Sequence, residues 1–170
     1  MILRRVLLCG ALILLAVILE VTVLAPLSFP GATPSLVLVV VAALAFAFGP
    51  VTGSACGFAA GLILDLAPPA SGTIGISALI LTVIGYLLGR VFESDDRPLA
   101  VAVVLTSAAA AAAVLAGAAL GGLLGNPRVQ WSDVPVMLIT AALYAAILAL
   151  PIIPLVRRLA RALVPEAFPR

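Results

Sequence analysis

The chain contains 170 residues, of which 65% are hydrophobic and only 9% are charged, and its formal net charge is +2. Because soluble domains carry roughly 25% charged residues, this composition excludes a water-soluble globular domain and predicts an integral membrane protein. The nine cations are all arginines and are scattered along the chain, which excludes a basic surface for nucleic acid.

Six apolar segments follow one another along the chain, and we predict that each crosses the bilayer as a helix. A crossing needs about 20 apolar residues, or fewer where the helix is short or the bilayer is thin. Proline and glycine breakers separate the segments, for example at Gly49-Pro50, Pro68-Pro69 and Asn126-Pro127. The predicted fold is therefore a single all-α transmembrane domain with short loops, with spans at residues 6–25, 35–49, 51–65, 73–91, 98–124 and 134–156.

The first segment follows Arg4-Arg5 and could be a signal peptide, with Ala25 at a plausible cleavage point. However, its apolar run is long, Pro26 follows directly, and the rest of the chain is equally apolar. We therefore expect an uncleaved first span.

The segments at 35–49 and 51–65 are short, so they could form two spans or one re-entrant hairpin. Two spans place eight of the nine arginines on one side of the membrane and only Arg128 on the other. If residues 51–65 do not cross, the arginines divide six to three. Since positive charges concentrate on the cytoplasmic side, we predict six spans with both termini in the cytoplasm.

Small residues recur at helical spacing in several predicted spans. In the third span, Gly53, Gly57, Gly61 and Asp65 are each four residues apart. Small residues let two backbones approach closely in a membrane, so we expect these stripes to pack helices together, or one of them to receive a partner's span. The helix-packing candidates are Gly53, Gly85, Gly89, Gly117 and Gly121, and the uniformly small fifth span, with Ala109, Ala113 and Gly125, is the preferred partner-binding candidate.

Two acidic residues lie inside predicted spans, where a charge is costly. Asp65, at the outer end of the third span, could cap the fourth span through the backbone of residues 71–73, or form a polar spot for a ligand or partner. A proton relay is the third alternative for Asp65. Glu20 lies roughly 7 Å below the outer interface at about 1.5 Å per residue, and it could face an outer cavity or snorkel to the interface.

The residue sets typical of enzymes are missing from the sequence. Cys9 and Cys56 are far apart along the chain and there is no histidine, so we expect no metal site, no cofactor and two buried cysteines. We also find no Ser-His-Asp set and no paired carboxylates at catalytic spacing. The sequence therefore predicts a protein that is not an enzyme.

The stretch from Gly57 to Gly89 resembles the core signature of the rod shape-determining protein MreD family. That signature combines a Gly-x-x-x-Gly-hydrophobic-Asp stretch, a glycine-rich turn and a helix ending in Gly-Tyr-hydrophobic-x-Gly. The six-span layout of the whole chain is similar to that family as well. The matching residues here are Gly57, Gly61, Asp65, Gly72, Gly75, Gly85, Tyr86 and Gly89.

The resemblance implies a non-enzymatic scaffold of the bacterial cell-elongation complex in the cytoplasmic membrane, with a fold similar to substrate-binding subunits of energy-coupling-factor transporters. It implies an MreC-like single-span partner and, through it, MreB filaments and the cell-wall synthases of peptidoglycan synthesis. The alternative is a vitamin-binding subunit of such a transporter, which needs more polar groups around an outer pocket than this sequence offers. The expected ligand- or partner-binding residues are Asp65, Gly57, Gly61, Gly72, Gly75 and Glu20.

Overall fold

The computed structural model describes residues 2–27, 31–67, 74–91, 98–125 and 131–164. These residues form six α-helices, and the first of them continues into a π-helical turn, η1 (Glu20–Leu24), and a 3-10 turn, η2 (Ala25–Leu27). The α-helices are α1 (Ile2–Leu19), α2 (Leu36–Phe48), α3 (Pro50–Leu66), α4 (Ile76–Val91), α5 (Leu99–Leu123) and α6 (Val134–Leu163).

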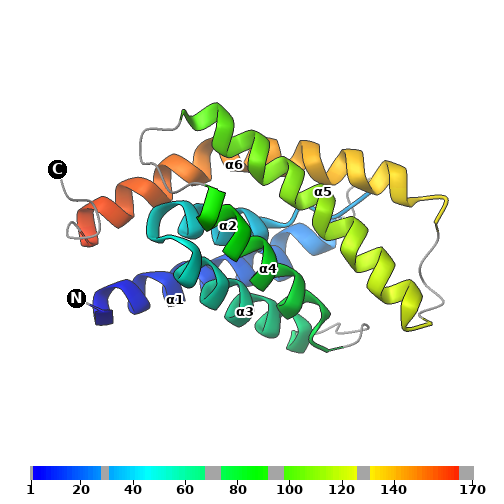
Figure 1. The fold of residues 1–170 in the computed structure, drawn as a ribbon, viewed down its shortest axis with the longest axis horizontal. Helices are drawn as coiled ribbons and strands as arrows, with labels where there is room; N and C mark the ends of the chain where they lie inside the picture. Colours follow the sequence, from blue (N-terminus) through cyan, green and yellow to red (C-terminus); the bar gives the residue numbers. More distant parts are fainter. Residues whose placement is uncertain (1, 28–30, 68–73, 92–97, 126–130, 165–170) are drawn as a thin grey trace.

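Consecutive helices run in opposite directions, so that α1 begins and α6 ends at the same end of the molecule (Figure 1). All the described arginines lie toward that end, which we call the basic end: Arg4, Arg5, Arg90, Arg157, Arg158 and Arg161. The described acids lie toward the opposite end, which we call the acidic end: Glu20, Asp65 and Asp133.

Three stretches in the described part of the chain are long and apolar enough to cross a membrane, namely Leu3–Leu24, Leu99–Leu123 and Val134–Leu163. The other three helices are shorter, with 13 residues in α2, 17 in α3 and 16 in α4. The structure is thus all-helical and of membrane type, while six crossings remain a prediction.

Helix α6 extends beyond the predicted end at residue 156 and finishes at Leu163. Two prolines, Pro151 and Pro154, lie inside it, and interior proline normally weakens a helix. The helix continues because its last turns are anchored by packing: Ile153, Val156 and Ala160 are buried.

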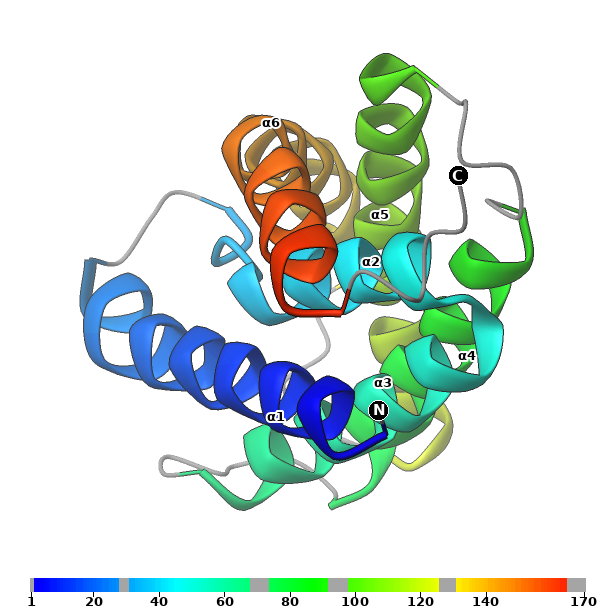
Figure 2. The same cartoon turned by 90° about the vertical axis from the view of Figure 1, so that its left-hand side faces the viewer.

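Helix α2 is the centre of the fold, since it contacts each of the other five helices (Figure 2). Every residue from Leu36 to Ala47 is buried, as expected for a helix that is apolar on all sides. Its 13 residues give a length of about 20 Å, which is shorter than the roughly 30 Å hydrocarbon core of a bilayer. A helix of this length cannot reach both surfaces of such a core, so its ends need polar partners within the protein.

Arg5 satisfies the end of α2 that lies at the basic end. Its guanidinium donates to the backbone carbonyl of Phe48 at 2.6 Å and to the hydroxyl of Thr52. The same group lies 4.7 Å from the centroid of the Phe48 ring. A cation is favourable here because the carboxyl end of a helix carries a partial negative charge.

Helices α3 and α4 form a hairpin whose backbones touch directly. A β-carbon at Gly53 would overlap the carbonyl of Gly85, and one at Gly61 would overlap the backbone of Ala78. A β-carbon at Gly57 would likewise overlap the carbonyl of Leu81. The glycine spacing of α3 is thus used inside the chain, to bring α4 close.

The outer surface of the bundle is largely apolar. Side chains exposed by more than half include Leu7 on α1, Phe58 on α3, Leu79 on α4, Val104 on α5 and Ile139 on α6. Such a surface on every side of the bundle matches surrounding lipid rather than water.

Candidate functional site

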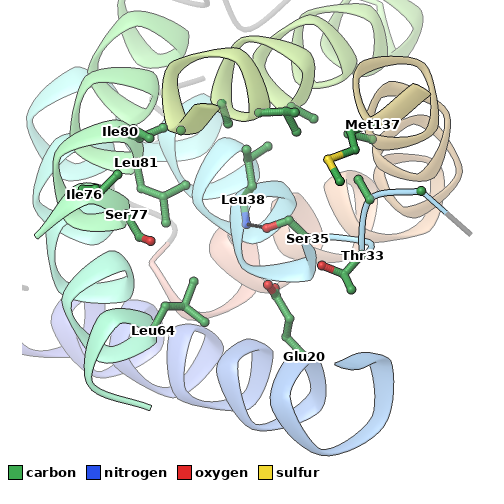
Figure 3. A pocket seen from close by; sticks show the side chains of 17 residues that line it. Glu20, Thr33, Ser35, Leu38, Leu64, Ile76, Ser77, Ile80, Leu81 and Met137 are labelled. Atoms are coloured by element: carbon green, nitrogen blue, oxygen red, sulfur yellow. Dashed lines mark hydrogen bonds between the residues drawn. The ribbon is translucent and has the colours of Figure 1, made fainter. Parts of the chain in front are cut away.

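A pocket of about 510 Å³ opens between the helices at the acidic end of the molecule (Figure 3). Its lining comes from η1, from residues 31–35 and from each of the helices α2 to α6. The pocket lies beside the start of α2, and the short length of that helix leaves the space open. Of the two alternatives that the sequence left open for Glu20, an outer cavity or the interface, this pocket supplies the cavity.

Small residues of α5 keep the pocket wide. Ala110, Ala113 and Gly117 line it from that helix. A β-carbon added at Gly117 would meet only Ile80 Cδ1, at 3.9 Å. Within α5, the stripe that the sequence favoured for a partner's span therefore faces the interior: Ala109 and Gly121 are buried, and Ala113 and Gly117 border the pocket. Gly125, which the sequence placed in the same stripe, lies beyond the end of α5 and is exposed.

Glu20 contributes the acidic group of the pocket and also caps α2. Its Oε2 accepts a hydrogen bond from the backbone N–H of Val37 at 2.7 Å, while the hydroxyl of Ser35 accepts from the N–H of Leu38 at 3.4 Å. The first N–H groups of a helix lack partners within the helix, and its amino end carries a partial positive charge. Glu20 is therefore held by α2 inside the protein, and it faces the cavity rather than only the interface.

The π-helical turn η1 begins at Glu20. Such a turn inserts one additional residue into a helix and changes the direction of the side chains that follow, and such turns are frequent at functional sites. In Figure 3 the Glu20 side chain extends from η1 toward Ser35 and the pocket.

Polar groups gather on one side of the pocket, where Glu20, Thr33 and Ser35 lie, and Ser77 faces them from α4. The segment 31–35 is tied to α6, because the N–H of Ala32 donates to the hydroxyl of Thr140 at 3.0 Å. Among the described residues that line the pocket there is one acid and no arginine.

Asp65 caps α4 in the way that Glu20 caps α2. Its Oδ2 accepts from the N–H of Gly75 at 2.8 Å and from the N–H of Ala78 at 3.3 Å. The donors that the sequence suggested, within residues 71–73, lie outside the described residues. Asp65 does not line the pocket, although its neighbour Leu64 does.

The remaining predicted site residues fall into separate groups. Gly57 and Gly61 face α4, as described above. Gly75 has a positive φ of 102° and open space where a side chain would be, so its glycine is needed for the turn and not for close packing. Gly72 lies outside the described residues.

Sequence reasoning missed several features of the site. Ser35 could have been found, because a serine directly before an apolar helix is a typical N-cap. Thr33 and Ser77 carry no such signal. The chain also brings together Cys9 of α1 and Cys56 of α3, which are both buried and whose side chains interact.

In the part of the chain that the structure describes, no group of three or more histidine, cysteine, aspartate or glutamate side chains could hold a metal ion. The arrangement offers helix caps and a pocket with hydrogen-bond acceptors. These groups can bind another molecule and hold it in position, so the chemistry of the site favours molecular recognition.

Residues 2–163 of the chain match the family described as rod shape-determining protein MreD. The chain belongs to the MreD family. This confirms the resemblance seen between Gly57 and Gly89, and extends it over nearly the whole length. Comparisons with curated proteins and with solved structures found no match.

Membership of the MreD family supports a role in the determination of rod shape and a place in the membrane. MreD proteins form a shape-determining family and not an enzyme family. The family gives no support to the vitamin-transport alternative. The predicted likeness to energy-coupling-factor subunits stays a prediction, since no solved structure matches the chain.

Proposed function

We propose that this MreD-family chain is a non-enzymatic, multi-pass scaffold in the bacterial cytoplasmic membrane. In this proposal it binds an MreC-like single-span protein and, through it, serves MreB filaments and cell-wall synthases during elongation. The observation that carries the proposal is the family match over residues 2–163. The apolar exterior supports it, because partner helices and lipid are the neighbours that such a surface suits.

The proposed topology is six spans with both termini in the cytoplasm. The alternating helix directions support it, as does the separation of the described arginines from the described acids (Figure 1). In this arrangement the basic end faces the cytoplasm and the pocket opens toward the outside, as the positive-inside tendency favours.

We propose that the α3–α4 hairpin contributes to partner binding through its shape. Gly57 and Gly61 hold the two helices together, and Asp65 with Gly75 sets where α4 begins at the acidic end. The partner then recognises the ends of α3 and α4 around Asp65 and Gly75. Gly72, which the sequence adds to this group, lies outside the described residues.

The first test is crosslinking and affinity purification of the tagged protein from its native membranes, with co-purifying proteins identified by mass spectrometry. We expect an MreC-like single-span protein and cell-wall synthases, and neither should appear with a tagged multi-pass protein of an unrelated family. Recovery of a transporter coupling subunit with ATPases, without the MreC-like protein, would overturn the proposed function.

A further inference from the structure

The pocket at the acidic end has properties that a scaffold role does not require. We propose that it binds a membrane amphiphile whose head carries N–H or O–H donors and no negative charge, with the head at Glu20 and the aliphatic body along α4, α5 and α6. This proposal is independent of the partner proteins named above, because it concerns a site between this chain's own helices.

The size and construction of the cavity point to a ligand. This half-open space measures about 510 Å³, which lies within the range of small-molecule pockets. It is bordered by several helices at once, and the small side chains Ala110, Ala113 and Gly117 leave it open. At Gly117 there is room for a side chain to begin, since a β-carbon there would touch only the end of Ile80, at 3.9 Å.

The polar residues of the lining determine which head group of the ligand can bind. A carboxyl group has room to accept about four hydrogen bonds. Glu20 already accepts from the N–H groups of Val37 and Leu36 and from the hydroxyl of Ser35, so it keeps capacity for about one more. The hydroxyls of Thr33 and Ser77 can accept or donate. Because the described lining contains this acid and no arginine, a carboxylate or phosphate head would find no cationic partner there, whereas an ammonium or hydroxyl head can donate to the Glu20 oxygens.

The apolar residues of the lining determine which hydrocarbon part of the ligand can bind. The other walls of the pocket are formed by aliphatic and thioether side chains, including Leu38, Leu64, Ile80, Leu81 and Met137 (Figure 3). An apolar chain gains from leaving polar surroundings for such walls. The polar and apolar sides together match a molecule with a small donor head and a hydrocarbon tail.

The test uses three probes with the same tail: dodecylamine, dodecanol and dodecanoate. Binding to the purified full-length protein is measured by native mass spectrometry and by the shift of the unfolding temperature in a mild detergent. Gly117→Leu fills the pocket, and Glu20→Gln replaces the acid with an amide whose oxygen can still accept from Val37. Ala112→Leu is the matched control, because Ala112 lies on the exposed side of the same helix.

We expect dodecylamine and dodecanol to bind and dodecanoate to bind at least about tenfold more weakly. Gly117→Leu should lose binding of all the probes, Glu20→Gln should weaken dodecylamine most, and Ala112→Leu should bind as the parent does. A preference for dodecanoate, equal binding by Gly117→Leu and the parent, or no binding of any probe would overturn the proposal. Since partner purification is measured separately, failure here leaves the scaffold role standing.

Discussion

At the scale of single residues, the two acids inside predicted spans have the same structural solution. Glu20 follows α1 and caps α2, and Asp65 near the end of α3 caps α4. In each case a carboxylate that lipid would disfavour receives hydrogen bonds from backbone N–H groups at a helix start, where negative charge is favourable. Of the three alternatives for Asp65, the structure shows the cap. A role in partner binding then acts through the shape of the hairpin.

The first prediction concerns this cap. Asp65→Ala should leave the protein inserted in the membrane but lower its free energy of unfolding by about 1 kcal/mol, because the N–H groups of Gly75 and Ala78 lose their acceptor. Unfolding in detergent, followed by circular dichroism, measures the change. Rod shape in cells that carry only this variant should also be impaired.

Asp65→Asn distinguishes the capping role of the side chain from the role of its negative charge, since asparagine caps helices about as well as aspartate. We expect this variant to keep most of the stability and the rod shape. Normal stability and normal shape in Asp65→Ala would show that the residue has neither role.

At the scale of helices, close backbone contact distinguishes the α3–α4 hairpin from the other helix pairs. Its glycines meet backbone atoms of the facing helix, so the contact has no flexible side chain that could yield. Helix α5, in contrast, uses its small residues to border a pocket. The same sequence feature, small residues at helical spacing, thus packs one pair of helices and opens a space beside another.

The second prediction follows from the hairpin. Gly61→Ala should destabilise the protein by about 1–3 kcal/mol, as overpacking does, because the new β-carbon would overlap Ala78. Gly10→Ala is the matched control, since a β-carbon there meets nothing within 4 Å and alanine favours a helix. Equal unfolding free energies for the two variants would contradict the described contact.

The third prediction concerns the contact between α1 and α3. Cys9 and Cys56 are both buried and their side chains interact, so Cys56→Phe should lower the free energy of unfolding by about 1–3 kcal/mol, as overpacking does. Cys56→Ala is the smaller change and should cost less than Cys56→Phe. Unfolding in detergent, followed by circular dichroism, measures both variants, and a Cys56→Phe variant as stable as the parent would refute this packing.

At the scale of the whole molecule, the fold is a ring of helices around the short, buried α2 (Figure 2). The surrounding helices expose apolar side chains outward. The ends of α2 are satisfied by Arg5 at the basic end and by Glu20 at the acidic end. This arrangement leaves room for a pocket at the acidic end, because α2 does not extend as far as its neighbours.

The fourth prediction tests how the molecule crosses the membrane. In a background with Cys9 and Cys56 replaced by alanine, single cysteines at Leu3, Ser132 and Ala162 are exposed and can react with a membrane-impermeant maleimide. Six spans place Leu3 and Ala162 on the cytoplasmic side and Ser132 outside. If instead Leu3 and Ser132 react from the same side, five spans are present and the region 51–65 does not cross.

The sequence by itself determined the membrane class, the approximate helices between proline and glycine breakers, and the MreD family. These features depend on local properties, namely hydropathy, turn residues and a short motif. Such properties can be recognised without knowing how the helices pack against one another. The helix ends were less predictable, since the start of α4 depends on Asp65 from another helix and the length of α6 on packing.

Only the tertiary structure decided that α2 is central, that Glu20 reaches Val37, and that Cys9 meets Cys56. It also decided that the small residues of α5 border a pocket. In water, the polar face of a helix shows which side is outside. In lipid both the interior and the surroundings are apolar, so a helix such as α5 carries no pattern that reveals its inner face. The inner face of α5 is determined by the shapes of the neighbouring helices, so it can be identified only once the helices are packed together.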